Sequence, residues 1–207
     1  SLSRSELRSR AVDLLDLVGI SQPETRVDNY PHEFSGGMRQ RALIAMCVAN
    51  EPDLIIADEP TTALDVTVQA QILDVLSRIQ DRTSSSLMLI THDLGVIAGF
   101  ADRVAVMYSG DVIEEGGVDS VFYETAHPYT RGLLGSLPRL DARNRSEPLY
   151  RIPGFQPSPA QRPAGCSFHP RCSIAVAGKC DTEIPIVHRA GPEHVARCHL
   201  VQDQEVN

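Results

Sequence analysis

The sequence predicts an α/β protein built around a parallel sheet, with helices before the sheet and a segment rich in cysteine and proline after it. Residues 54–57 and 87–90 are short apolar runs that end in polar residues, as is typical of strands buried on both faces. Between them, apolar side chains recur at helical spacing from Val68 to Ile79. The order strand, helix, strand indicates a parallel βαβ unit.

Helices are expected ahead of this unit. Ser3 and Glu6 have the spacing of a capping box at the start of an amphipathic helix over residues 3–18. A polar stretch follows, and Ser35 can cap a second helix that runs to residue 49. Cys47 falls within this second helix and is expected in the core.

The region after the second predicted strand is expected to mix helices and a hairpin. A Ser-Gly-Asp sequence is a turn signal between two short strands, and a His-Pro pair interrupts a later helical pattern. The expected elements are a helix over 94–100, strands over 104–108 and 112–114 joined at 109–111, and a helix over 118–137 broken near His127.

The last 70 residues differ in composition from the rest of the chain. Prolines recur from Pro138 onward with little periodicity, which predicts an extended segment and not a packed layer. Four of the five cysteines lie here, at the spacing Cys166-x5-Cys172-x7-Cys180-x17-Cys198. Four thiolates can bind zinc or hold a [4Fe-4S] cluster, and both remain open. The four histidines nearby are expected to be surface residues; they are His169, His188, His194 and His199.

Charge and hydropathy exclude two broad classes of function. The formal net charge is −8 and the pI is near 5.3, which speaks against binding nucleic acid through phosphate neutralisation. No apolar run approaches the roughly 18 residues needed to span a bilayer, and residues 1–10 lack the apolar core of a signal peptide.

Two motifs suit the binding of a nucleotide. Asp58 and Glu59 follow an apolar strand, where carboxylates point into the crevice in which α/β proteins bind ligands and can hold magnesium and a water molecule. Ser35, Gly36 and Gly37 begin a helix, where unpaired amides attract anions and glycines allow the backbone to approach phosphate closely. Each motif alone is also compatible with an ordinary acidic turn or helix start.

The ordered set of motifs resembles the ATPases of ABC transporters. Ser35-Gly36-Gly37 resembles the signature loop, residues 54–58 the Walker B strand, Ala63-Leu64-Asp65 the D-loop and His92 the switch histidine. The resemblance implies the following roles: Asp58 binds Mg²⁺, Glu59 is the catalytic base, His92 contacts the γ-phosphate, Asp65 belongs to the nucleotide site, and Ser35, Gly36, Gly37 and Met38 bind ATP held by a partner subunit.

Longer stretches are similar to one branch of that family, the importers of oligopeptides and dipeptides. They include Phe-Ser-Gly-Gly-Met from Phe34 and His-Pro-Tyr-Thr from His127. The branch implies a peripheral subunit at the cytoplasmic face of the membrane that uses ATP and Mg²⁺. Its partners would be a second ATPase subunit in a head-to-tail dimer, transmembrane permease subunits and, indirectly, a peptide-binding protein. The branch also links the four tail cysteines to an iron-sulfur cluster.

One expected motif is absent from the sequence. No G-x-x-x-x-G-K-[ST] loop occurs, so nothing here cradles the β- and γ-phosphates. Family architecture places this loop upstream, and we therefore expect the sequence to begin inside the helical subdomain of a longer P-loop NTPase and to be inactive alone. The expected division is a helical subdomain over 1–50, part of the ATPase core over 51–137 and an extension over 138–207.

Two further expectations follow from the missing loop. An incomplete parallel sheet would leave an apolar edge and face uncovered. The alternative function is a catalytically dead remnant that acts as a metal-binding interaction module.

Overall fold

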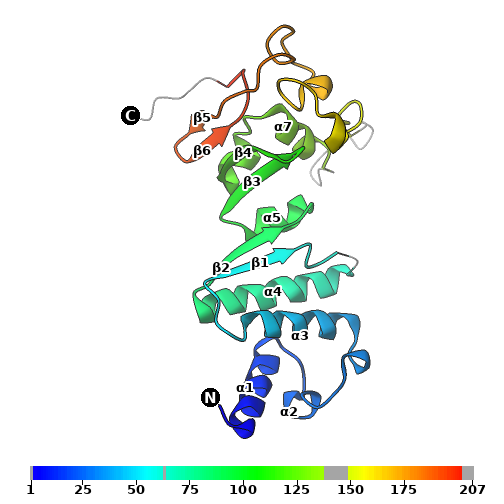
Figure 1. Ribbon diagram of the computed structural model, residues 1–207, viewed down its shortest axis with the longest axis vertical. Helices are drawn as coiled ribbons and strands as arrows, with labels where there is room; N and C mark the ends of the chain where they lie inside the picture. Colours follow the sequence, from blue (N-terminus) through cyan, green and yellow to red (C-terminus); the bar gives the residue numbers. More distant parts are fainter. Residues whose placement is uncertain (1, 63, 138–148, 202–207) are drawn as a thin grey trace, which may run out of the picture. The chain divides into compact units, whose positions relative to one another are not determined.

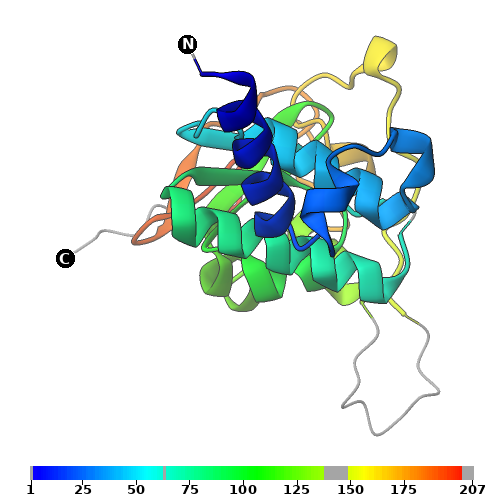
Figure 2. The same cartoon turned by 90° about the horizontal axis from the view of Figure 1, so that it is seen from below.

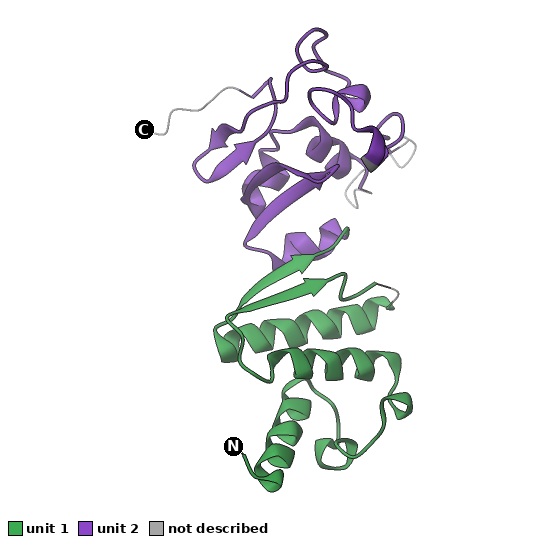
Figure 3. Ribbon diagram, viewed as in Figure 1, with its two compact units in different colours: residues 1–92 green, residues 93–207 purple. Residues whose placement is uncertain are grey.

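The computed structural model describes residues 2–62, 64–137 and 149–201. The chain divides into two compact units, residues 1–92 and 93–207 (Figure 3). No helix in the described parts of either unit is long and apolar enough to cross a bilayer.

The first unit begins with the predicted capped helix. Helix α1 (Arg4–Leu17) starts after Ser3, whose hydroxyl accepts a hydrogen bond from the Glu6 amide at 3.3 Å while the Glu6 carboxylate accepts one from the Ser3 amide at 2.7 Å. The capping box is therefore confirmed. The polar stretch that follows contains two short elements that periodicity did not reveal, α2 (Pro23–Arg26) and the 3-10 helix η1 (Pro31–Glu33).

Helices α3 (Gly36–Val48) and α4 (Val66–Thr83) supply most of the first unit's buried apolar side chains. Helix α3 follows its cap Ser35, and α4 follows its cap Asp65. They pack side by side (Figures 1 and 2). The buried side chains of the pair are Ile44, Ala45 and Val48 from α3 and Ile72, Val75, Leu76 and Ile79 from α4.

The expectation that Cys47 belongs to the core is wrong. Cys47 is exposed, because the buried stripe of α3 runs through Ile44, Ala45 and Val48 and Cys47 lies to one side of it.

Strands β1 (Leu54–Asp58) and β2 (Ser86–Ile90) pair in parallel, with Asp58 opposite Ile90, which confirms the βαβ unit. The helices lie against one face of this pair (Figure 1). The other face presents apolar side chains that are 45% to 61% exposed, namely Leu54, Ile56, Met88 and Ile90. The strands are therefore not buried on both faces, and an exposed apolar face is present among the described residues, as expected.

The second unit contains an antiparallel sheet with the strand order β3-β4-β6-β5. Strands β3 (Arg103–Tyr108) and β4 (Asp111–Gly117) form the predicted hairpin. Ser109 and Gly110 connect them with φ of 49° and 85°, as expected of a turn that matches the twist of a hairpin. Strands β5 (His188–Gly191) and β6 (His194–Ala196) come from the proline-rich segment.

The helices of the second unit agree with the sequence pattern. The predicted break at His127 separates α6 from α7, and His127 caps α7. The helical elements are α5 (Leu94–Phe100), α6 (Val118–Tyr123), α7 (Pro128–Gly135), and the 3-10 helices η2 (Pro159–Gln161) and η3 (His169–Arg171).

The cysteine-rich segment packs into the second unit, so the prediction of an extended segment is wrong for its described part. Phe168 is 3% exposed, and its ring centroid lies 5.3 Å from that of Tyr108 and 5.4 Å from that of Tyr129. Strand β6 also pairs with β4. Strand pairing and aromatic contacts thus order a segment that shows little periodicity of its own.

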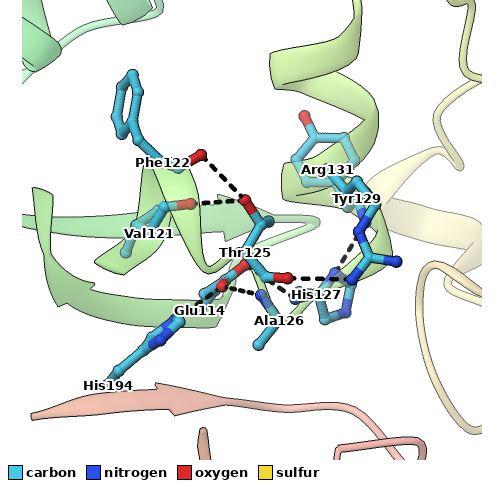
Figure 4. A network of polar contacts seen from close by, with 9 residues as sticks. All are labelled: Glu114, Val121, Phe122, Thr125, Ala126, His127, Tyr129, Arg131 and His194. Atoms are coloured by element: carbon cyan, nitrogen blue, oxygen red, sulfur yellow. Dashed lines mark hydrogen bonds and ion pairs between the residues drawn. The ribbon is translucent and has the colours of Figure 1, made fainter. Parts of the chain in front are cut away.

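A buried carboxylate joins three parts of the second unit (Figure 4). Glu114 of β4 accepts hydrogen bonds from the amides of Ala126 at 2.6 Å and His127 at 3.0 Å, and lies 2.8 Å from Nε2 of His194 on β6. His127 Nδ1 accepts a hydrogen bond from the Tyr129 amide at 3.0 Å. His194 is 1% exposed, so the expectation that it is a surface residue is wrong. Its partner Glu114 explains how a histidine is tolerated there.

This network predicts a pH-dependent stability. Burial lowers the pKa of His127 to about 4, whereas a histidine in the unfolded chain has a pKa of about 6.5. As pH falls from about 6.5 to 4, the unfolded chain binds a proton that the native chain does not, and the free energy of unfolding decreases. His127→Asn keeps an acceptor at the cap of α7 and should remove up to roughly 1.4 kcal/mol per pH unit of this slope.

Urea unfolding between pH 4.5 and 7 measures the slope. The exposed His32 provides the matched control, because His32→Asn should leave the slope as in the original protein. Equal slopes for His127→Asn and the original protein would contradict the assignment.

Candidate functional site

Asp58 and Glu59 lie at the carboxyl end of β1, as predicted. Asp58 is the last residue of the strand, and Glu59 follows it with φ of 49°, in the left-handed region that residues other than glycine rarely adopt. The Glu59 amide donates to the Ile90 carbonyl of β2 at 2.9 Å. This bond holds Glu59 in a costly backbone conformation, a feature that is concentrated at functional sites.

His92 meets Glu59 across the end of the sheet. His92 Nδ1 lies 2.8 Å from Oε1 of Glu59, although the two residues are 33 positions apart in the sequence. The His92 side chain is 81% exposed and that of Glu59 is 39% exposed, so both can reach a ligand from solvent. The structure therefore brings together the two residues that the sequence assigned to catalysis.

Thr62 is a third member of this group, and the sequence analysis did not single it out. Its hydroxyl donates a hydrogen bond to Oε2 of Glu59. The hydrogen bond from Thr62 and, next, that with His92 lower the pKa of Glu59 below its ordinary value. The carboxylate is thus ionised at neutral pH and can accept a hydrogen bond from a water molecule. Only the position of Thr62, three residues after Glu59, could have suggested this contact.

The predicted signature loop forms the start of α3. The Ser35 hydroxyl accepts a hydrogen bond from the Met38 amide at 3.3 Å, which fixes the first helical turn. A side chain at Gly36 would meet no atom within 4 Å, so this turn is open to a ligand. At Gly37 a Cβ atom would lie 3.1 Å from Cγ1 of Val68, so a side chain there would crowd α4. An open helix N-terminus of this kind suits an anion.

A hydrogen bond connects the signature helix with the segment that follows the acidic strand. Gln40 Nε2, on α3, donates to the Pro60 carbonyl at 3.1 Å. The bond spans 20 sequence positions. No sequence motif announces it, because a glutamine on a helix usually faces solvent.

The predicted D-loop is only partly described. Ala63 lies outside the described residues. The Asp65 carboxylate accepts a hydrogen bond from the Val68 amide at 3.0 Å and so caps α4. This contact is structural; a role for Asp65 in binding a nucleotide remains a prediction.

The four tail cysteines line one small pocket of about 20 Å³. They are Cys166, Cys172, Cys180 and Cys198, and all are free thiols. However, among residues 2–62, 64–137 and 149–201 no group of three or more His, Cys, Asp or Glu side chains could hold a metal ion. The structure gathers the cysteines around a common space, and the predicted metal centre is not confirmed.

Burial and backbone amides both act on these thiols. Burial raises the pKa of Cys166, Cys172 and Cys198, and neighbouring thiols raise it further. Amides two residues downstream of each of these three cysteines act in the opposite direction, and the Val176 amide donates to Sγ of Cys180 at 3.4 Å. Hydrogen bonds from amides to sulfur are also found around cysteine-bound clusters, where they tune the reduction potential.

The contact between Thr62 and Glu59 leads to a prediction. Thr62→Val removes the largest cause of the lowered pKa, and the Glu59 pKa should rise towards its ordinary value without reaching it, because the His92 bond remains. A ¹³C NMR titration of the Glu59 carboxyl measures the change. Thr61→Val is the matched control and should leave the Glu59 pKa unchanged; a Glu59 pKa unaffected by Thr62→Val would refute the contact.

Two models of known protein families match this chain, one in each unit. Residues 3–62 match the family model described as "ABC transporter", and residues 113–180 match "Oligopeptide/dipeptide transporter, C-terminal region". The first match includes the signature loop and the Asp58-Glu59 strand. The second includes most of strand β4 and three of the four tail cysteines.

Individual relatives agree with these matches. The oligopeptide transport ATP-binding protein OppD of Mycobacterium bovis is 53% identical over 95% of this chain, which spans 32% of that protein. OppD of Bacillus subtilis is 52% identical over 89% of this chain, which spans 51% of that protein. The solved structure of cbiO1 from Clostridium perfringens, part of the ABC transporter complex cbiONQ, is 31% identical with a TM-score of 0.53, over 60% of this chain and 49% of that one. The chain is thus similar in fold to an ABC-type ATPase over 60% of its length, and it belongs to the family of ABC transporter ATP-binding proteins, in the branch named for oligopeptide and dipeptide transport.

Proposed function

We propose that these residues form part of the ATP-hydrolysing subunit of an ABC importer that energises the uptake of oligopeptides or dipeptides. The contact that carries the proposal is the 2.8 Å approach of His92 to Glu59, directly after Asp58 at the end of β1. The names of relatives about half identical to this chain support the peptide substrate. The alternative of a metal-binding module without a transport function finds no support in these relatives.

The residues of the site would divide the work of hydrolysis. Asp58 would hold a Mg²⁺ ion, which would supply positive charge to the nucleotide phosphates, and Glu59 would orient and deprotonate the attacking water. His92 would contact the γ-phosphate while it remains hydrogen-bonded to Glu59. The lowered pKa of Glu59 keeps its carboxylate ionised, so it can accept a hydrogen bond from the water. A lower pKa also makes Glu59 a weaker base, so its main contribution would be to orient the water.

The signature loop would act on a second nucleotide. Ser35, Gly36, Gly37 and Met38 would bind ATP that a second ATPase subunit holds, in a head-to-tail dimer, with Asp65 near the same interface. Transmembrane permease subunits would anchor the dimer at the cytoplasmic face of the membrane, and a peptide-binding protein would deliver the substrate. In this proposal, residues 1–50 carry the signature loop, residues 51–137 carry the residues for hydrolysis, and residues 138–207 form a C-terminal extension.

The proposal predicts how activity depends on Glu59. The 207 residues alone should hydrolyse no ATP, since they contain no P-loop. In a version that carries a P-loop ahead of Ser1, Glu59→Gln should slow turnover by about 10²- to 10⁴-fold and leave ATP binding intact, because it removes the base and no phosphate contact.

Phosphate release and nucleotide-binding assays measure the two effects. Glu51→Gln, at an exposed carboxylate of the same unit, should keep the original rate. Two outcomes would refute the assigned roles. One is ATP hydrolysis by the 207 residues alone that Glu59→Gln abolishes, and the other is full turnover of the Glu59→Gln version that carries the P-loop.

We also propose that the four tail cysteines hold a metal centre, with a [4Fe-4S] cluster preferred over zinc. Thiols are the ligands that both zinc and iron-sulfur clusters use. Four of them line one pocket here, and an amide donates to the sulfur of Cys180. A bound cation would reverse the effect of burial on the thiol pKa and hold the sulfurs as thiolates. It would also add a cross-link within this segment.

The metal proposal is tested by purification without oxygen. A cluster predicts a brown protein with iron and sulfide in near-equal amounts, whereas zinc predicts a colourless one. Cys180→Ser should lower the metal content and loosen the segment after residue 149, and Cys47→Ser, at the exposed cysteine of α3, should do neither. A protein purified without oxygen that contains neither metal would refute the proposal.

A further inference from the structure

We propose that a second, larger pocket in unit 93–207 binds a small organic carboxylate, independently of the proposed ATPase function. The pocket has a volume of about 450 Å³ and is formed by β4, residues 162–168, residues 184–185 and Arg197. This volume lies in the range of known small-molecule sites, about 300–1,000 Å³. The cysteine pocket is separate, although Cys166 and Phe168 line both.

The pocket carries a net positive charge. Of its two arginines, Arg162 forms an ion pair with Asp111 and donates from Nε to the Ser167 hydroxyl at 3.1 Å. The Ser167 hydroxyl also lies 3.5 Å from Oδ2 of Asp111. Asp111 therefore compensates Arg162, and the charge of Arg197 remains for a ligand.

Arg197 has a buried donor that lacks an acceptor. Nε of Arg197 is inaccessible to solvent, and within the described parts of the chain it makes no hydrogen bond. The arginine backbone is fixed, because its amide donates to the Ile113 carbonyl of β4 at 2.8 Å. Because Nε is closed to solvent, a ligand in the pocket would meet the two outer nitrogens of this guanidinium, and Arg197 is one of the residues that line the pocket. Guanidinium groups bind carboxylates with two parallel hydrogen bonds.

The remaining walls select against a bare inorganic anion. Ile113, Phe168 and Pro185 are buried, and Pro163 and Ala164 complete an apolar lining. Pockets of this composition favour a ligand with an apolar body and one polar group.

The loop that forms one wall is held firmly in place. Gly165 has φ of 66°, and a Cβ there would lie 2.5 Å from the Cys180 carbonyl, so only glycine fits. The Cys166 amide donates to the same carbonyl at 2.9 Å. The pocket is therefore formed before any ligand binds, which reduces the entropic cost of binding.

Calorimetric titration of the protein with N-acetyl-L-leucine tests the inference. We expect saturable binding of one molecule. The neutral N-acetyl-L-leucinamide and inorganic phosphate should each bind at least about tenfold more weakly, because one lacks the charge and the other the apolar body. A tetrapeptide ending in leucine distinguishes a free acid from a peptide terminus as the source of the carboxylate; binding of either form supports the shared chemistry.

Substitutions locate the site. Arg197→Gln should weaken binding of N-acetyl-L-leucine by about 10- to 100-fold, Arg197→Lys by less, and Arg151→Gln, at an exposed arginine of the same unit, should leave it unchanged. Should Arg197→Gln unfold the protein, the NMR signal of the Arg197 Nε–H in the original protein serves instead, and it should shift with the acid and stay with the amide. Equal affinity for acid and amide, affinity for phosphate equal to that for the acid, or full binding by a folded Arg197→Gln protein would overturn the inference.

Discussion

The parallel pairing of β1 with β2 is the constraint on which the candidate site depends. Asp58 is opposite Ile90 in this register, and the bond from the Glu59 amide to the Ile90 carbonyl continues the pairing one residue beyond β1. That bond turns Glu59 towards His92, which follows β2 by two residues. A shift of one residue in register would move the acidic residues to the other face of the sheet. Helix α4 connects the two strands in the sequence and lies along one face of the pair (Figure 1).

In the second unit, a buried carboxylate is the group on which the arrangement of the neighbouring elements depends. Glu114 receives two amide hydrogen bonds from the turn before α7 and a contact from His194 of β6. A carboxyl group is tolerated in a protein interior when such partners satisfy its oxygens. Glu114 thus joins the predicted hairpin to the proline-rich segment, and its loss would leave two amides and Nε2 of His194 without this partner.

The same segment carries both pockets of this unit. Residues 162–168 form a wall of the larger pocket and bring Cys166 and Phe168 to the smaller one. Because Phe168 also packs on Tyr108 and Tyr129, the aromatic cluster gives both pockets one rigid support. A segment with little apolar periodicity can in this way present defined sites, since its order comes from the sheet beside it.

The sequence by itself determined the features that depend on neighbouring residues. Helix caps at Ser3 and Ser35, the strand–helix–strand order and the hairpin at Gly110 all follow from spacings of a few positions, and all are found. The expectation that Glu59 and His92 serve one site rests on the resemblance of the motifs to those of a known family, and their contact was not predicted. Local spacing carries this information because capping, turns and amphipathic faces form between residues close in the chain.

Only the tertiary structure decided which side chains meet across the fold. The bond from Thr62 to Glu59, the burial of His194 against Glu114 and the unpaired Nε of Arg197 have no sequence signature. The same holds for burial: Ile56 is 61% exposed although it lies in an apolar run, because helices cover only one face of its sheet. Such contacts depend on the packing of distant elements. The sequence gives the type of a residue but does not show whether that packing will bury it or supply it with a partner.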